Sequence, residues 1–191
     1  MTNQTVNAGD ERENDRSKPW ELDRFARVAA FTALFLAAAI PLLTLLNWFN
    51  IMPLEDIEAL ETFIASDGVS SSRRFGGFLI AMIPKAVLVY GLWRLSQMFQ
   101  DFSKGNIFTP STEGHLRVFA WSLFGFVLLD FIIEAPLSAY ATWMAPEGSR
   151  LISLSFDWDD IHTLLLGMLV FALSRVIAEG ARLARENAEF V

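Results

Sequence analysis

The feature that most constrains this chain is an apolar run, Val28 to Phe49, that contains no charged residue. A soluble domain alternates apolar and polar positions at the period of a helix or a strand, so an uninterrupted run of about 22 residues is typical of a membrane span. At about 1.5 Å per residue, a helix of this length crosses the roughly 30 Å of hydrocarbon in a bilayer. The run therefore predicts one transmembrane helix.

Three further segments have the length and apolar content of spans. The chain contains 53% hydrophobic residues and 17 Phe, which is high for a soluble protein, and the excess is concentrated in these blocks. We expect an all-α membrane protein in which four transmembrane helices form a bundle, at about residues 28–49, 75–93, 118–143 and 161–178. Residues 25–191 would form this domain. Residues 1–24 are too polar for a signal peptide and should be a disordered cytoplasmic tail.

Lysine and arginine are unevenly distributed among the connections. Eleven lie in the N-terminal tail, in the connection between the second and third spans, and at the C-terminal end, whereas only three lie in the other two connections. Because cytoplasmic loops carry the excess of Lys and Arg, this bias predicts that both termini are cytoplasmic. The connection between the second and third spans would then face the cytoplasm as well.

The connection between the second and third spans has strong local signals. Leu95 to Lys104 should continue the second helix beyond the membrane surface until Gly105 ends it as a C-cap. Thr109 followed by Pro110 is typical of the N-cap and first residue of the next helix. The two helices should therefore form a tight hairpin that projects into the cytoplasm.

The outer connections have patterns of their own. Pro53 to Ala65 places its apolar residues at helical spacing among acids, which predicts a short amphipathic helix on the outer membrane surface. From Ile152 to Trp158, apolar residues alternate with Ser and Asp, a period of two that predicts an extended or strand-like segment. Its aromatic residues could anchor at the lipid interface.

Two stretches resemble a known family. Gly105-Asn106-Ile107-Phe108-Thr109-Pro110, followed by Leu116-Arg117 and Trp121, is similar to the central signature of a bacterial family of small membrane proteins, the domain of unknown function 2975. The C-terminal run from Leu166 through Gly180 to Glu186-Asn187 and Phe190-Val191 is similar to that family's ending, although Arg185 replaces an expected Glu. The resemblance covers roughly residues 28–191.

The resemblance implies four spans in a bacterial cytoplasmic membrane and no established activity. Many family members are similar to proteins encoded beside a small helix-turn-helix regulator of the Cro repressor type, which implies a cytoplasmic partner of that kind. It supplies no catalytic residues.

Four charged residues lie within the predicted spans: Arg175 is near the inner end of the fourth, and the other three lie deeper in the second and third. A charged side chain at mid-bilayer costs about 2.5 to 3.5 kcal/mol on insertion scales, so Lys85 should not face lipid unpaired. Asp130 and Glu134 stand one helical turn apart on the same face of the third span. We predict that Lys85 pairs with Asp130, with Glu134 nearer the outer surface. The pair could pin the second helix to the third, or the three residues could line a polar cavity for ions, protons or a small ligand.

An acidic cluster precedes the fourth span. Asp157, Asp159, Asp160 and His162 are weak candidates for a metal site, because their spacing matches no EF-hand or zinc pattern. Acids near a helix N-terminus are favoured by the helix dipole, so we expect no metal here. His115 lies in the predicted hairpin with no His or Cys nearby, and we expect an ordinary solvated residue.

Function is then a choice between classes. The chain lacks the H-E-x-x-H, G-x-S-x-G, Walker and G-x-G-x-x-G motifs, so we expect no enzyme and no cofactor. The net charge of −7 argues against direct nucleic-acid binding. One hypothesis is a regulatory or sensory membrane protein that docks a cytoplasmic partner; the other is a small transporter or channel subunit that uses the intramembrane charges. Oligomers are compatible with either. The candidate docking residues are Phe99, Phe102, Ile107, Phe108 and Arg182.

Overall fold

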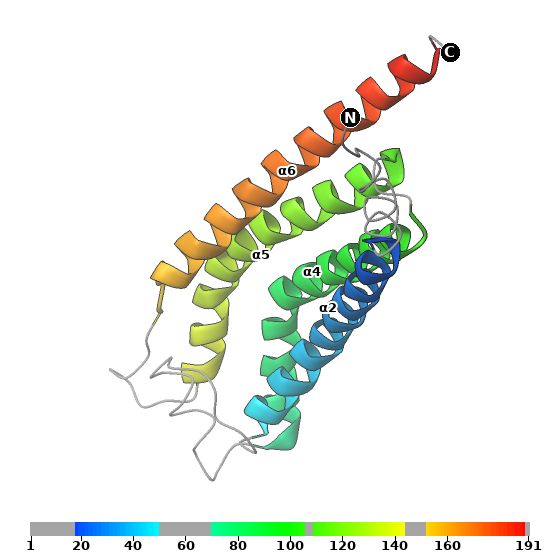
Figure 1. The fold of residues 1–191 in the computed structure, drawn as a ribbon. Helices are drawn as coiled ribbons and strands as arrows, with labels where there is room; N and C mark the ends of the chain where they lie inside the picture. The colour runs from blue at the N-terminus through cyan, green and yellow to red at the C-terminus, as the bar shows by residue number, and fades with distance from the viewer. Residues whose placement is uncertain (1–17, 50–69, 106–108, 144–151, 190–191) are drawn as a thin grey trace, which may run out of the picture.

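The computed structural model describes residues 18–49, 70–105, 109–143 and 152–189. Over these ranges the chain forms long α-helices, labelled as in Figure 1: α2 (Lys18–Trp48), α4 (Ser71–Ser103), α5 (Pro110–Thr142) and α6 (Trp158–Glu189). The predicted amphipathic helix at Pro53–Ala65 lies outside the described residues. Helix α2 begins at Lys18, so residues 18–24 of the predicted tail are helical, and Asp23 forms an ion pair with Arg27 one helical turn further on.

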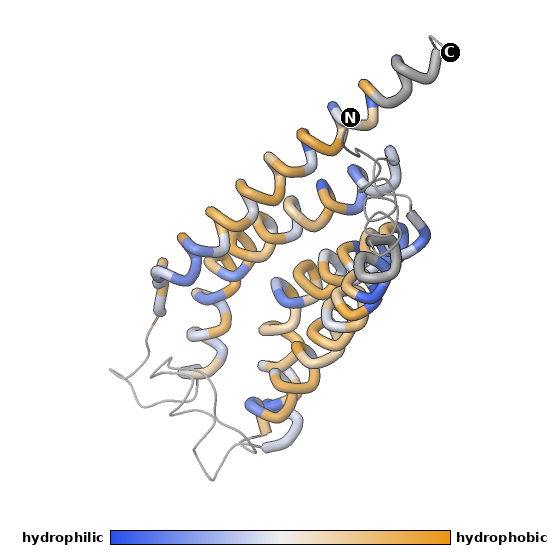
Figure 2. The backbone as a smooth tube through the Cα atoms, viewed as in Figure 1, coloured by the Kyte–Doolittle hydropathy of each residue, from blue (hydrophilic) through white to orange (hydrophobic). Residues whose placement is uncertain are grey.

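Each of these helices contains a stretch that is long and apolar enough to cross a membrane. The stretches are Asp23–Trp48, Ser71–Ser103, Pro110–Thr142 and Trp158–Leu183. Figure 2 shows apolar residues along most of each helix and polar residues gathered towards the helix ends. The prediction of an all-α protein with four helices able to span a membrane is confirmed.

The turn between α4 and α5 forms as its local chemistry predicts. Gly105 adopts a φ of +80°, a left-handed conformation that glycine accepts without a steric penalty, and its N–H donates to the Phe102 carbonyl at 3.0 Å. Pro110 is the first residue of α5, and the Thr109 hydroxyl accepts a hydrogen bond from the Thr112 N–H at 3.4 Å. The predicted N-cap, Thr109, is confirmed, whereas the C-cap of α4 is Lys104 and Gly105 ends the helix from the position after it.

The helices pack mainly in chain order, with α2 against α4, α4 against α5, and α5 against α6 (Figure 1). We call the end that carries Gly105, the start of α2 and the end of α6 the hairpin end. The opposite end, where α2 and α5 finish and α4 and α6 begin, is the loop end. Helices α4 and α5 are thus the inner pair of the row.

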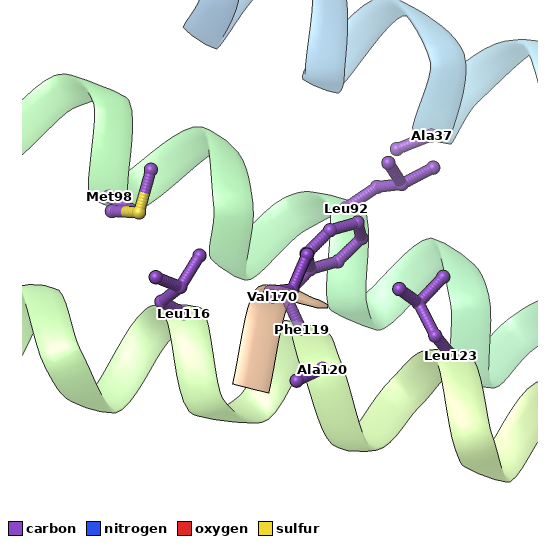
Figure 3. Close-up of a cluster of buried hydrophobic side chains, with 8 residues drawn as sticks. All are labelled: Ala37, Leu92, Met98, Leu116, Phe119, Ala120, Leu123 and Val170. Atoms are coloured by element: carbon purple, nitrogen blue, oxygen red, sulfur yellow. The ribbon is translucent and has the colours of Figure 1, made fainter. Parts of the chain in front are cut away.

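The larger cluster of the hydrophobic core is drawn in Figure 3. Its residues from α4 and α5 lie in the halves of those helices that are nearer the hairpin end. Every one of the four helices contributes to it, because α4 and α5 present their facing sides while α2 and α6 close it from outside. Its buried residues are Ala37, Leu92, Met98, Leu116, Phe119, Ala120, Leu123 and Val170. This cluster fills the space between α4 and α5 over that half of the helices.

A smaller cluster forms at the loop end around Trp48, which is fully buried together with Ala81 and Ala141. Two hydrogen bonds join the helix ends there. Arg74 donates from Nη1 to the Trp48 carbonyl at 3.3 Å, and Tyr140 donates from its hydroxyl to the Arg73 carbonyl at 3.1 Å. The end of α2, the start of α4 and the end of α5 are thereby held together.

Candidate functional site

A cavity of about 380 Å³ lies between α4, α5 and the beginning of α6, in the loop-end half of the molecule. Its lining combines apolar residues with charged and hydroxyl-bearing ones. The lining residues are Ala81, Pro84, Lys85, Phe126, Asp130, Phe131, Ile133, Glu134, Leu137, Ser155, Asp157, Asp159, Asp160 and Thr163.

The three intramembrane charges singled out by the sequence all line this cavity. Lys85 comes from α4, next to the buried Pro84, whereas Asp130 and Glu134 come from α5. All three side chains are half-buried. The structure therefore brings the three residues to one place, and the ion pair between Lys85 and Asp130 stays a prediction.

Glu134 binds a segment that is distant in the sequence. Its Oε1 accepts hydrogen bonds from the hydroxyls of Ser153 and Ser155, both at 2.8 Å, and its Oε2 accepts the Ser155 N–H at 2.7 Å. The Ser153 N–H donates to the Ser138 hydroxyl at 3.0 Å, one turn further along α5. Hydrogen bonds to an ionised acceptor are stronger than those between neutral groups. We call Ile152–Asp157, which these bonds attach to α5, the strap.

The strap has two edges, as the alternating pattern predicts, but it is not a β-strand. Ser153 and Ser155 face α5, whereas Ile152, Leu154 and Phe156 remain 73%, 56% and 54% exposed. No regular secondary structure is assigned to this segment. Side chains of α5, rather than a neighbouring strand, bind its N–H groups at Ser153 and Ser155, and Trp158 already belongs to α6.

The acids at the start of α6 lie at the helix N-terminus, where one of them caps the helix. Asp160 accepts the Asp157 N–H at 3.0 Å, the reciprocal half of a capping box. Asp159 and His162 are exposed, with 3.9 Å between the Asp159 carboxylate and the His162 Nδ1. Among the described residues no group of three His, Cys, Asp or Glu side chains is arranged to hold a metal ion. Asp157, Asp159 and Asp160 nevertheless border the cavity.

The predicted docking residues are not all on a free surface. Phe99 and Phe102 are half-buried and pack against the larger core cluster, and Phe99 also contacts the Phe25 ring of α2, with 6.4 Å between centroids. Arg182 is exposed and pairs with Glu179 and Glu186 on its own helix. Ile107 and Phe108 lie outside the described residues. A docking role for this set stays a prediction.

The expectation that His115 is solvated is wrong. Its side chain is only 16% exposed, and its Nε2 lies 3.8 Å from an Asp101 carboxylate oxygen. The physical reason is that α4 extends to Ser103 and covers this face of α5.

The serine partners of Glu134 were missed by the sequence reasoning. The alternation from Ile152 to Trp158 is the signal that could have found them, because it places Ser153 and Ser155 on one edge of an extended segment. Serine hydroxyls donate hydrogen bonds, and the acid Glu134 in the preceding span is an acceptor for them. Their separations from Glu134 along the chain, 19 and 21 residues, carry no local signature.

One protein-family model, described as "Protein of unknown function (DUF2975)", matches residues 35–191. This match confirms the resemblance carried by the turn between α4 and α5 and by the C-terminal run. No curated protein and no solved structure matches the chain.

Proposed function

The chain belongs to the DUF2975 family of proteins of unknown function, and we propose that it is a non-enzymatic sensory membrane protein that binds a small cationic ligand in the charged cavity. The observation that carries the proposal is the position of Lys85, Asp130 and Glu134 on the wall of one cavity. Ionisable residues are expensive within a membrane and generally mark functional sites.

The lining favours a positively charged ligand. Five acidic residues line the cavity, Asp130, Glu134, Asp157, Asp159 and Asp160, against one basic residue, Lys85. Walls of one charge sign concentrate counter-ions, most strongly where the surroundings have a low dielectric constant. The Phe126 and Phe131 rings offer apolar contact and a cation–π surface for an organic cation. The volume is in the range of small-molecule sites.

The helices that line the cavity also form the hairpin. Helix α4 continues from Lys85 to Ser103, and α5 runs from Pro110 to Asp130, without interruption. Each contains a proline near the cavity level, Pro84 and Pro136, where the backbone hydrogen-bond ladder is broken and a helix can bend. A ligand that changes either bend would therefore displace the hairpin.

The membrane orientation belongs to the proposal. The excess of Lys and Arg at the hairpin end favours a cytoplasmic hairpin and cytoplasmic termini, which places the cavity in the outer half of the molecule. By resemblance to its family, the partner at the hairpin end would be a cytoplasmic helix-turn-helix regulator, and the membrane that of a bacterium. Docking would involve Ile107, Phe108 and the exposed Arg182.

The alternative, a small transporter or channel subunit, is favoured by the same intramembrane charges. Packing on the other side of the cavity argues for binding instead. A conduit along the interface of α4 and α5 would have to pass Leu92, Phe119 and Leu123, which are buried in the larger core cluster (Figure 3). A cavity closed at its inner side suits a receptor better than a pore.

Thermal unfolding of the purified protein in detergent tests ligand binding. The probes are spermidine, ethanolamine and Mg²⁺, with citrate as the anionic comparison. We expect a cation to raise the Tm, because a ligand that binds only the folded state stabilises it by RT ln(1 + [L]/Kd). The shift should shrink in Asp130→Asn and persist in Glu186→Gln, an exposed acid on α6 away from the cavity. Equal shifts in both variants, or no shift with any cation, would contradict the proposal.

Flux of the same cation into proteoliposomes separates the two functions. A receptor should give no flux above protein-free vesicles. Flux that disappears in the Lys85→Met, Asp130→Asn double variant would support the transporter.

Docking is tested by co-purification of a candidate regulator with the membrane protein. We expect Phe108→Ala or Arg182→Glu to reduce recovery, with His162→Gln as the control, because His162 is exposed at the loop end and does not line the cavity. Recovery that is the same in all variants would rule out this docking surface.

A further inference from the structure

We propose that the strap is a lid over the cavity and that its apolar edge lies in the lipid interface of the bilayer. Its serine edge is held to Glu134 by the hydrogen bonds from Ser153 and Ser155, which we call the latch. The strap borders the cavity through Ser155 and Asp157. Its position thus controls access to the cavity from the loop end. The inference concerns the regulation of the proposed binding site, and it rests on the proposed function only for the identity of what enters.

The latch is concentrated on one carboxylate. Three of the hydrogen bonds that attach the strap to α5 end on the two oxygens of Glu134, at 2.7 to 2.8 Å. Glu134 is itself part of the cavity wall. A cation that drew this carboxylate inward would weaken all three bonds together, so occupancy of the cavity and attachment of the strap are coupled by geometry.

The latch also decides where the apolar edge points. In an extended segment successive side chains point to opposite sides, so holding Ser153 and Ser155 against α5 turns Ile152, Leu154 and Phe156 away from it. Phe156 makes an edge-on contact with Phe131, a partly exposed residue of α5, with 6.5 Å between ring centroids. The apolar edge is therefore continuous with the outer surface of a membrane-spanning helix.

The surroundings of this edge fit the membrane interface. Trp158, the first residue of α6, is 75% exposed, and Trp143, the C-cap of α5, is 71% exposed. Tryptophan is enriched at the level of the lipid headgroups, where its ring is partly in hydrocarbon and its N–H is hydrated. The strap lies directly before the apolar span of α6, and the acids Asp159 and Asp160 follow the strap in the first turn of that helix. A lipid surface thus covers the edge without any additional partner.

Site-directed spin labelling tests the lipid contact, because the chain contains no cysteine and each introduced thiol is unique. The protein is reconstituted without ligand into phosphatidylcholine and phosphatidylglycerol vesicles with a label on Leu154→Cys. The reference labels are on Leu169→Cys, an exposed apolar position within the α6 span, and on Asp159→Cys, an exposed acid. Collisions with oxygen report lipid, and collisions with a water-soluble nickel chelate report solvent.

We expect the label at position 154 to favour oxygen over the nickel chelate, as the label at 169 does. Nickel accessibility equal to that at 159 would overturn the lipid contact. Protection from both reagents would also overturn it, because a protein surface would then cover the edge.

The latch is tested with the same label at position 154 in two variants. One removes the acceptor of the latch and the other removes donors. Glu134→Ala removes the acceptor, and the Ser153→Ala, Ser155→Ala pair removes two donors from the strap. We expect the label at 154 to become more mobile and several-fold more accessible to nickel in both. The label at 169 should be unchanged, which shows that the helices remain packed. If Glu134→Ala also alters the label at position 169, that variant disturbs helix packing, and the result of the serine double variant is then used alone. No change at 154 in the serine pair would overturn the latch.

These measurements use no ligand, so they are independent of the proposed function. Failure of the spin-label test with an intact cation-dependent Tm shift would refute the lid alone. The reverse result would refute the cation site and leave the lid in place.

Discussion

A β-carbon placed on Gly77 would lie 2.0 Å from Cζ3 of Trp48. Trp48 is the last residue of α2 and is completely buried, so its ring occupies the position that any side chain at Gly77 would need. The absence of a side chain on α4 is therefore what allows α2 to pack against it at the loop end.

The contact predicts that Gly77→Ala destabilises the protein, because the Trp48 ring is large, buried and unable to withdraw without leaving a void. Overpacking of this kind costs about 1–3 kcal/mol. Gly114→Ala is the matched control, since a β-carbon there meets nothing within 4 Å and alanine favours a helix. The measurement is the unfolding free energy in mixed detergent micelles. Equal effects of the two substitutions would disprove the role of the Trp48 contact.

A second close approach joins the inner helices. A β-carbon on Gly91 would lie 1.7 Å from the Ser122 hydroxyl oxygen and 2.6 Å from the Ser122 β-carbon. Gly91→Ala should therefore be destabilising, and adding Ser122→Gly should recover part of the loss. We expect a coupling energy above about 0.5 kcal/mol in the double-mutant cycle, as for residues in direct contact. Strict additivity of the two changes would argue against the contact.

The predicted ion pair in the cavity makes the third test. If Lys85 and Asp130 pair, Lys85→Met leaves a carboxylate without its counter-charge and should cost about 3–5 kcal/mol. The Lys85→Met, Asp130→Asn double variant should be closer to wild type than Lys85→Met alone. Unfolding free energies of the four proteins in the cycle give the result. A double variant less stable than either single one would show that the two charges do not pair.

Membrane orientation can be measured because the chain has no native cysteine. Asp159→Cys places a thiol at the loop end and Lys104→Cys one at the hairpin end, both at exposed positions. The assay uses spheroplasts, in which the outer face of the sealed cytoplasmic membrane is accessible. We expect a membrane-impermeant maleimide to label position 159 at once and position 104 only after the cytoplasmic membrane is permeabilised. The opposite order would place the hairpin outside and invalidate the proposed orientation.

The sequence determined the features that depend on neighbours along the chain. Uncharged apolar length predicts the helices able to span a membrane, because a backbone in lipid must satisfy its own hydrogen bonds. Gly105 and the Thr109-Pro110 pair predict the turn, since left-handed φ and N-capping are local properties. Even the two edges of the strap are present in the alternation from Ile152 to Trp158.

Only the tertiary structure decided what those features meet. The partners of Glu134, the burial of His115 and the fit of Trp48 onto Gly77 each depend on how helices are rotated and bent against one another. Small differences in those angles, summed over many weak side-chain contacts, move a residue from lipid to cavity, and no short pattern in the chain records them. The charged residues of the cavity are thus readable from the sequence, whereas the cavity and the strap that borders it are properties of the packed helices.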